Sequence, residues 1–207
     1  VRSLTDVEVD SSGNIYATAY SHNPSDNHLY KVNDSGVVLW EKNLGGGRGS
    51  DGYSSSVTLD SNDNAYALNN DGVLQQFAPD GTPGWSTDLT PGNDQLGFSD
   101  LLMKDGNIYG IGRQSDVTIG SYSGEPIGII EVSSEGNINS FDLINGLPVE
   151  NGLFDQFSFT EGSGENEFYV TGNTYAENGW DAYVAGISKN QSFSDERNFL
   201  DIEGTYS

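Results

Sequence analysis

The sequence contains no cysteine, and its eight lysine and arginine residues face 31 aspartate and glutamate residues, a formal net charge of −23. Without cysteine, a disulfide framework, thiol catalysis and a cysteine-ligated zinc site are excluded. The few cations are scattered, so the chain lacks the basic patch that nucleic acids and anionic membranes require, and we expect neither partner. No apolar run approaches the roughly 18 residues of a membrane helix, so no membrane insertion is expected.

Helical periodicity is also missing, and a repeated phrase stands in its place. Turn residues followed by an alternating segment occur four times: DSSGNIYATA (10–19), DSNDNAYALN (60–69), MKDGNIYGIG (103–112) and GENEFYVTG (164–172). The aligned tyrosines are Tyr16, Tyr66, Tyr109 and Tyr169. Internal similarity with a period of about 50 residues is typical of repeat architectures.

Each repeat holds four short segments with the two-residue alternation of a β-strand, joined by turns rich in Gly, Asp, Asn and Ser. The tyrosine segment is the second strand of each repeat. The first strands are expected at 4–10, 54–60, 98–104 and 154–160, the third at 28–33, 72–79, 127–133 and 181–188, and the fourth at 37–44, 84–89, 138–144 and 196–202. Four antiparallel strands per repeat predict an all-β fold, a β-propeller, with a hairpin solenoid as the alternative.

We expect residues 1–207 to form a single propeller region with blades at roughly 1–47, 48–92, 93–147 and 148–207. The apolar faces of the two end blades would stay exposed in an open arc. We therefore expect about four blades that belong to a larger ring, or to a ring completed by oligomerisation. A closed four-bladed ring is the alternative.

Two segments, YSSSVTLDSNDNAYAL (53–68) and FYVTGNTYAENGWDAYVAGIS (168–188), resemble the blades of bacterial β-propeller repeat proteins of the seven-bladed type. A third, AYALNNDGVLQQFAPDGTPGWSTDL (65–89), is similar to quinoprotein-type repeats, in which a Trp ends the last strand. The resemblance covers nearly the whole chain and implies an extracellular, cell-surface or periplasmic bacterial protein. No residues match a quinone pocket, so that cofactor is not carried over.

One copy of the repeated turn has the alternating oxygens of a calcium loop. Asp60, Asn62 and Asp63 lie at suitable spacing, but the mid-loop glycine and the later bidentate glutamate are missing. The alternative is a hairpin turn in which Asp60 binds its own backbone. We favour the turn, predict no other cofactor, and keep calcium as the one metal to test.

Three further features have weaker spacing. His22 and His28 flank Asp26 without a third ligand, and we expect an ordinary surface loop there. The glycine-rich segment 45–52 lacks the Lys-Ser/Thr pair of a phosphate loop and is expected to connect two blades. Trp180 is expected in the core of a blade edge rather than as a sugar-stacking platform.

The repeat tyrosines, Trp40 and Trp85 recur at fixed positions and are expected in the core. Segments 113–126 and 161–167 are the longest departures from the repeat, and unique loops of repeat proteins are where binding is expected.

The leading hypothesis for function is a non-catalytic extracellular module that binds a protein or carbohydrate ligand or serves as a scaffold, as a homo-oligomer or beside other domains. One alternative is a polysaccharide-acting hydrolase or lyase with its site in the central channel. Another is a calcium-dependent adhesion or assembly module. Inward-facing residues of the first strands discriminate: two or three carboxylates or a histidine favour the enzyme, and small or hydroxyl residues oppose it.

Overall fold

The computed structural model describes residues 2–22, 25–46, 55–90, 96–114, 118–119, 122–123, 127–144, 157–162, 164, 167–176, 179–188 and 200–201. The regular elements in these ranges are all β-strands. Within the same ranges, no helix is long and apolar enough to cross a membrane. The strands form four four-stranded sheets, each a meander from first to fourth strand, together with one short hairpin. The all-β prediction of four-stranded antiparallel blades is confirmed.

The four sheets follow one another along the chain. Blade 1 contains β1 (Arg2–Val9), β2 (Ile15–His22), β3 (Ser25–Val32) and β4 (Val38–Gly45). Blade 2 contains β5 (Ser56–Leu59), β6 (Ala65–Leu68), β7 (Val73–Phe77) and β8 (Pro83–Asp88). Blade 3 contains β9 (Leu96–Lys104), β10 (Asn107–Gln114), β13 (Ile127–Ser133) and β14 (Ile138–Ile144). Blade 4 contains β15 (Phe157–Glu161), β16 (Glu167–Ala176), β17 (Gly179–Ser188) and β18 (Leu200–Asp201).

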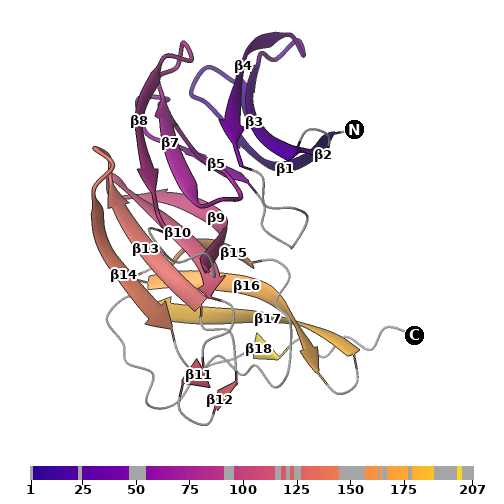
Figure 1. Ribbon diagram of the computed structural model, residues 1–207, viewed down its shortest axis with the longest axis vertical. Coiled ribbons are helices and arrows are strands. Elements are labelled where there is room, and N and C mark those ends of the chain that lie inside the picture. Colours follow the sequence, from indigo (N-terminus) through magenta and orange to yellow (C-terminus); the bar gives the residue numbers. More distant parts are fainter. Residues whose placement is uncertain are drawn as a thin grey trace.

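Figure 1 shows the blades side by side along an arc, with blade 1 at one end and blade 4 at the other. The first strands of consecutive blades contact each other, β1 with β5, β5 with β9 and β9 with β15. The insert of blade 3 carries an extra hairpin, β11 (Thr118–Ile119) and β12 (Tyr122–Ser123), that the repeat did not predict.

The repeated turn works through its first aspartate. The Oδ1 atom of Asp10 accepts the backbone N–H groups of Ser12 and Asn14, while Gly13 takes a φ of +82°. A positive φ is costly for most residues but free for glycine. In blade 2 the same turn places Asp63 at a φ of 62°, which aspartate tolerates better than most side chains.

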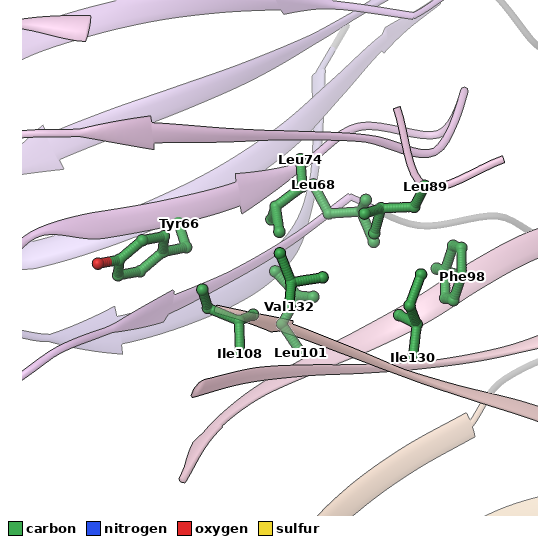
Figure 2. Packing of buried hydrophobic residues seen from close by; sticks show 9 residues of the cluster. All are labelled: Tyr66, Leu68, Leu74, Leu89, Phe98, Leu101, Ile108, Ile130 and Val132. Carbon is green, nitrogen blue, oxygen red and sulfur yellow. The ribbon is translucent and has the colours of Figure 1, made fainter. Parts of the chain in front are cut away.

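Aromatic and aliphatic side chains fill the space between blades. Figure 2 shows the core between blades 2 and 3, built from Tyr66, Leu68, Leu74, Leu89, Phe98, Leu101, Ile108, Ile130 and Val132. A matching core between blades 1 and 2 contains Tyr16, Leu29, Leu44, Val57, Ala65, Ala67 and Phe77. Removing this apolar surface from water is the main stabilising term between sheets that share no backbone ladder.

The two repeated tryptophans connect each blade to the turn of the next. The indole Nε1 of Trp40 donates to the carbonyl of Pro79, and that of Trp85 donates to the carbonyl of Ser134. Each indole ring also lies against the glycine that follows its acceptor residue by two positions, Gly81 for Trp40 and Gly136 for Trp85. An added Cβ on Gly136 would come 2.6 Å from Trp85. The tryptophans therefore pack between blades, partly buried, as the repeat predicts.

Two expectations about burial are wrong. Tyr169 is 44% exposed, whereas Tyr16 and Tyr66 are almost fully buried, because no described residue packs over the outer face of blade 4. His28 is not in a surface loop: it lies on β3, opposite Ala19 of β2, and is buried. His22 is on β2, opposite Ser25, so the two histidines belong to a hairpin rather than to one loop.

Candidate functional site

The first strands carry a polar residue at one equivalent position in every blade. Asp6, Ser56, Asp100 and Ser158 each pair with the residue two positions after the repeat tyrosine. Each is followed by an apolar residue, and in blades 2 to 4 this residue is buried on the side of the preceding blade, whereas Val7 of blade 1 is not covered by any described residue. We call these four residues the inner-strand series.

The first link of the inner-strand series joins blades 1 and 2. Asp6 Oδ2 accepts the hydroxyl of Ser56 at 2.6 Å and the backbone N–H of Val57 at 2.9 Å. Its other oxygen, Oδ1, accepts the N–H of Val7 at 2.8 Å. A carboxylate that accepts three donors is held firmly, since hydrogen bonds to a charged acceptor are stronger than neutral ones.

The next links repeat this geometry. Ser56 Oγ accepts the N–H of Leu101 in blade 3 at 3.2 Å, and its hydroxyl also lies within donating distance, 3.2 Å, of Asp100 Oδ1. Asp100 Oδ2 accepts the hydroxyl of Ser158 at 2.8 Å and the N–H of Phe159 at 3.0 Å in blade 4. Aspartate and serine thus alternate along the arc, and each described link satisfies a backbone N–H group on the first strand of the following blade.

The carboxylates of this region influence one another. Burial raises the pKa of Asp100, and the charge of Asp6 adds to the shift, against the hydrogen bonds from Ser158 and Phe159. Burial also raises the pKa of Glu8 on β1, with further contributions from Asp6 and Asp100. Like charges in a partly desolvated site disfavour ionisation, which is the pattern that acid catalysts use.

The residue types on the first strands therefore favour neither the enzyme nor the scaffold clearly. Asp6, Glu8 and Asp100 bring carboxylates to the first strands, while Ser56 and Ser158 bring hydroxyl groups. Two of the three carboxylates accept hydrogen bonds from the next blade on one oxygen and from their own strand on the other. A carboxylate in that position stabilises the sheet stack, and it must break those bonds before it can reach a substrate.

The candidate calcium turn has its oxygens occupied by protein donors. Asp60 Oδ1 accepts the N–H groups of Asn62 and Asn64, and Oδ2 accepts the Asn64 side chain and the Tyr66 hydroxyl. Asp63 accepts both the N–H and the hydroxyl of Ser11 in blade 1. In the part of the chain that the structure describes, no three His, Asp or Glu residues are placed to hold a metal ion. The calcium hypothesis stays a prediction.

Other predicted positions are only partly described. His28 Nδ1 lies 3.0 Å from Glu41 Oε1, which also binds Arg2, so this histidine joins a polar group on the free face of blade 1. Trp180 lies on β17, but its side chain is outside the described residues, as are most of segments 45–52 and 113–126. Segment 161–167 provides Gly164, whose carbonyl accepts Lys104.

The inner-strand series was not predicted from the sequence, although a signal for it exists. In each first strand, the polar residue of the series stands directly before an apolar residue, as in TDV, SSV, SDL and FSF. The alternation of Asp and Ser carries no known motif, so only the register of the first strands shows that these residues meet.

Comparison with solved structures supports the propeller fold. An α-L-arabinanase from Penicillium chrysogenum, complexed with arabinobiose, superposes with a TM-score of 0.62 at 11% identity over 95% of this chain and 65% of that one. Drosophila Semaphorin 2a gives a TM-score of 0.54 at 13% identity over 97% and 41%. BamB from Moraxella catarrhalis gives 0.50 at 15% identity over 90% and 47%.

These similarities show the fold alone, because all three identities are low. The chain spans between about two fifths and two thirds of the length of these proteins. The sequence matches no protein-family model, and a search of curated proteins found no significant match. The resemblance to bacterial propellers therefore holds for the β-propeller fold, and no sequence family is identified.

Proposed function

We propose that this chain is a non-catalytic β-propeller module that acts as a rigid scaffold and binds a protein or carbohydrate ligand outside the cytoplasm. The observation that supports it is the inner-strand series: Asp6 and Asp100 each use one oxygen to bind the first strand of the next blade and the other to accept an N–H of their own strand. A general acid or nucleophile needs an oxygen free to reach the substrate. The extracytoplasmic location rests on the resemblance to bacterial propeller repeats and on the acidic, cysteine-free composition.

A polysaccharide-acting hydrolase is the second candidate. The raised pKa values of Glu8 and Asp100 beside Asp6 favour it, since glycosidases pair a protonated carboxyl with an ionised one. The two functions predict different effects of the substitution Asp100→Asn. In a scaffold the substitution weakens folding, and in an enzyme it abolishes turnover even under conditions where the variant is fully folded.

The experiment incubates the purified chain with arabinan and a panel of other polysaccharides and measures released sugars by chromatography. We expect no release above that of the Asp100→Asn variant, measured at a temperature where circular dichroism shows both proteins folded. Release that persists in the surface control Asp34→Asn but disappears in Asp100→Asn would overturn the scaffold proposal. In the same samples, affinity electrophoresis in polysaccharide gels measures binding, which the proposal expects Asp100→Asn to retain.

A further inference from the structure

Blade 1 presents an apolar face that no described residue covers. Val7 and Val9 of β1 are each 59% exposed, and Ile15 of β2 is 36% exposed. The register places Val7 at the position that other blades bury against the preceding blade. The equivalent residues Val57, Leu101 and Phe159 are 1%, 5% and 6% exposed. The face of Val7 thus has the features of one half of a blade interface, and none of the described residues supplies the other half.

The turn between β3 and β4 carries the same signature. Gly81 and Gly136 lie against the tryptophan of the preceding blade, where an added Cβ would meet the rings of Trp40 and Trp85. Gly36 is the equivalent residue of blade 1, with a similar φ of +79°, and an added Cβ there would meet nothing within 4 Å. At Gly36, blade 1 therefore has an uncovered surface of the kind on which the outermost strand of a preceding blade packs in blades 2 and 3.

The opposite half of the interface lies at the other end of the arc. Tyr169 on β16 is equivalent to Tyr109, whose ring packs 5.0 Å from Phe168 of the next blade, yet Tyr169 is 44% exposed. Ser158 is equivalent to Asp6, the residue that accepts a backbone N–H from the next blade. Thr171 is equivalent to Thr18, which donates to the carbonyl of Ser55 in the next blade. The outer face of blade 4 therefore repeats the features with which blade 1 holds blade 2.

We propose that two copies of this chain associate head to tail, with blade 4 of each copy packed on blade 1 of the other, so that two arcs close one ring. Tyr169 packs on Val7 and Ile15 of the second copy, as Tyr109 packs on Phe168 within the chain. Ser158 Oγ accepts the N–H of Val7, as Ser56 accepts that of Leu101. Both contacts continue an interface that already recurs along the arc, and a heterologous contact of this kind forms a ring when its rotation closes.

Charge opposes this association. Each copy carries a formal net charge of −23, so two copies repel at low ionic strength. Screening shortens the range of that repulsion to about 8 Å at physiological salt and further above it. Apolar burial does not weaken with added salt, so the association constant rises as salt is added.

The test is sedimentation velocity of the full chain over a range of concentrations, at about 0.15 M and about 0.5 M NaCl. We expect a concentration-dependent species with twice the 22.2 kDa chain mass, more populated at the higher salt. Val7→Asp and Tyr169→Asp should each lower the association constant by at least about tenfold. Ile138→Asp is the matched control, because Ile138 is 42% exposed on β14 of blade 3, and this variant should associate like wild type.

A mixture of the two variants distinguishes this arrangement from others. Val7→Asp retains its Tyr169 face and Tyr169→Asp retains its Val7 face, so a mixed pair keeps one intact interface and should associate more strongly than either variant alone. Circular dichroism confirms that the exposed-site variants fold. A monomer at all concentrations and both salts overturns the proposal. A growing series of larger species also overturns it. A mixture that associates no better than its components overturns it as well, and is the result expected if the blade 1 faces of two copies paired with each other.

Discussion

Ser56 Oγ lies 2.6 Å from Asp6 Oδ2 and 3.2 Å from the backbone nitrogen of Leu101. One hydroxyl of blade 2 therefore donates to blade 1 and accepts from blade 3. Apolar cores between blades are non-directional and do not by themselves fix how one sheet is placed along the next. Hydrogen bonds at the first strands supply that direction, since the N–H groups of Val57, Leu101 and Phe159 each donate to a side chain of the preceding blade.

Replacing Asp6 with alanine should lower the free energy of unfolding by about 1–3 kcal/mol, because the N–H of Val57 loses the Asp6 carboxylate and the Ser56 hydroxyl keeps only its longer hydrogen bond, 3.2 Å, to Asp100 Oδ1. Urea unfolding followed by tryptophan fluorescence measures the change. Asp34→Ala is the control, since Asp34 is exposed and its carboxylate accepts the hydroxyl of the adjacent Ser35, so little change is expected. Equal effects of the two substitutions would count against a role for Asp6 between blades.

The pH dependence of stability should reveal the raised pKa of Asp100. A folded-state pKa above the unfolded value means that the folded protein gains stability as pH falls from above the folded pKa toward the ordinary aspartate value. Asp100→Asn removes this titration. We expect the variant to be more destabilised relative to wild type at about pH 4 than at about pH 8, as measured by urea unfolding at each pH. A larger difference at the higher pH would contradict the burial of this carboxyl.

The pKa values of the turn aspartates, Asp10 and Asp60, are shifted in the opposite direction to that of Asp100. Burial alone would raise the pKa of Asp10 and Asp60, but the hydrogen bonds each accepts outweigh it and hold both values below the ordinary one. Their stabilisation is therefore present at neutral pH and lost as pH falls below the ordinary aspartate pKa. Asp60→Asn should cost stability at about pH 7 and progressively less on acidification. A cost that stayed constant with pH would contradict the assignment.

Gly136, which lies against Trp85, can be compared with Gly36, the equivalent turn glycine of blade 1, where an added Cβ would contact nothing. Gly36→Ala places a Cβ at positive φ in open space, which costs about 1 kcal/mol. Gly136→Ala carries the same backbone cost and also pushes a Cβ into the ring of Trp85. We expect Gly136→Ala to be the more destabilising in thermal unfolding, with a shift in Trp85 fluorescence. Equal melting temperatures would mean that the ring does not rest on this glycine.

The repeat predicted the fold well because its signals are local. Alternating apolar residues and Asp, Gly and Asn turns place sixteen strands within a few residues of where the structure has them, as with Ile127–Ser133 and Ile138–Ile144. Burial of Tyr169 could not be predicted, since it depends on whether a next blade covers it. The inner-strand series was missed because Asp6 and Ser56 are 50 residues apart, and only sheet register brings them together.

Calcium provides a separate check on the turn at Asp60. Both Asp60 oxygens already accept protein donors, so we expect no shift of the thermal midpoint when millimolar calcium replaces EDTA. A rise in midpoint that Asp60→Asn abolishes and Asp10→Asn leaves intact would establish the calcium-loop interpretation. Asp10 is the matched residue because it occupies the same position in the turn of blade 1.

The most direct test of the inner-strand series is a double-mutant cycle between Asp100 and Ser158, which lie in different blades with Oδ2 and Oγ 2.8 Å apart. Unfolding free energies are measured for wild type, Asp100→Ala, Ser158→Ala and the double variant. If the pair holds blades 3 and 4 together, the coupling energy is favourable and about 0.5–3 kcal/mol. Additive effects, with a coupling energy near zero, would contradict the account.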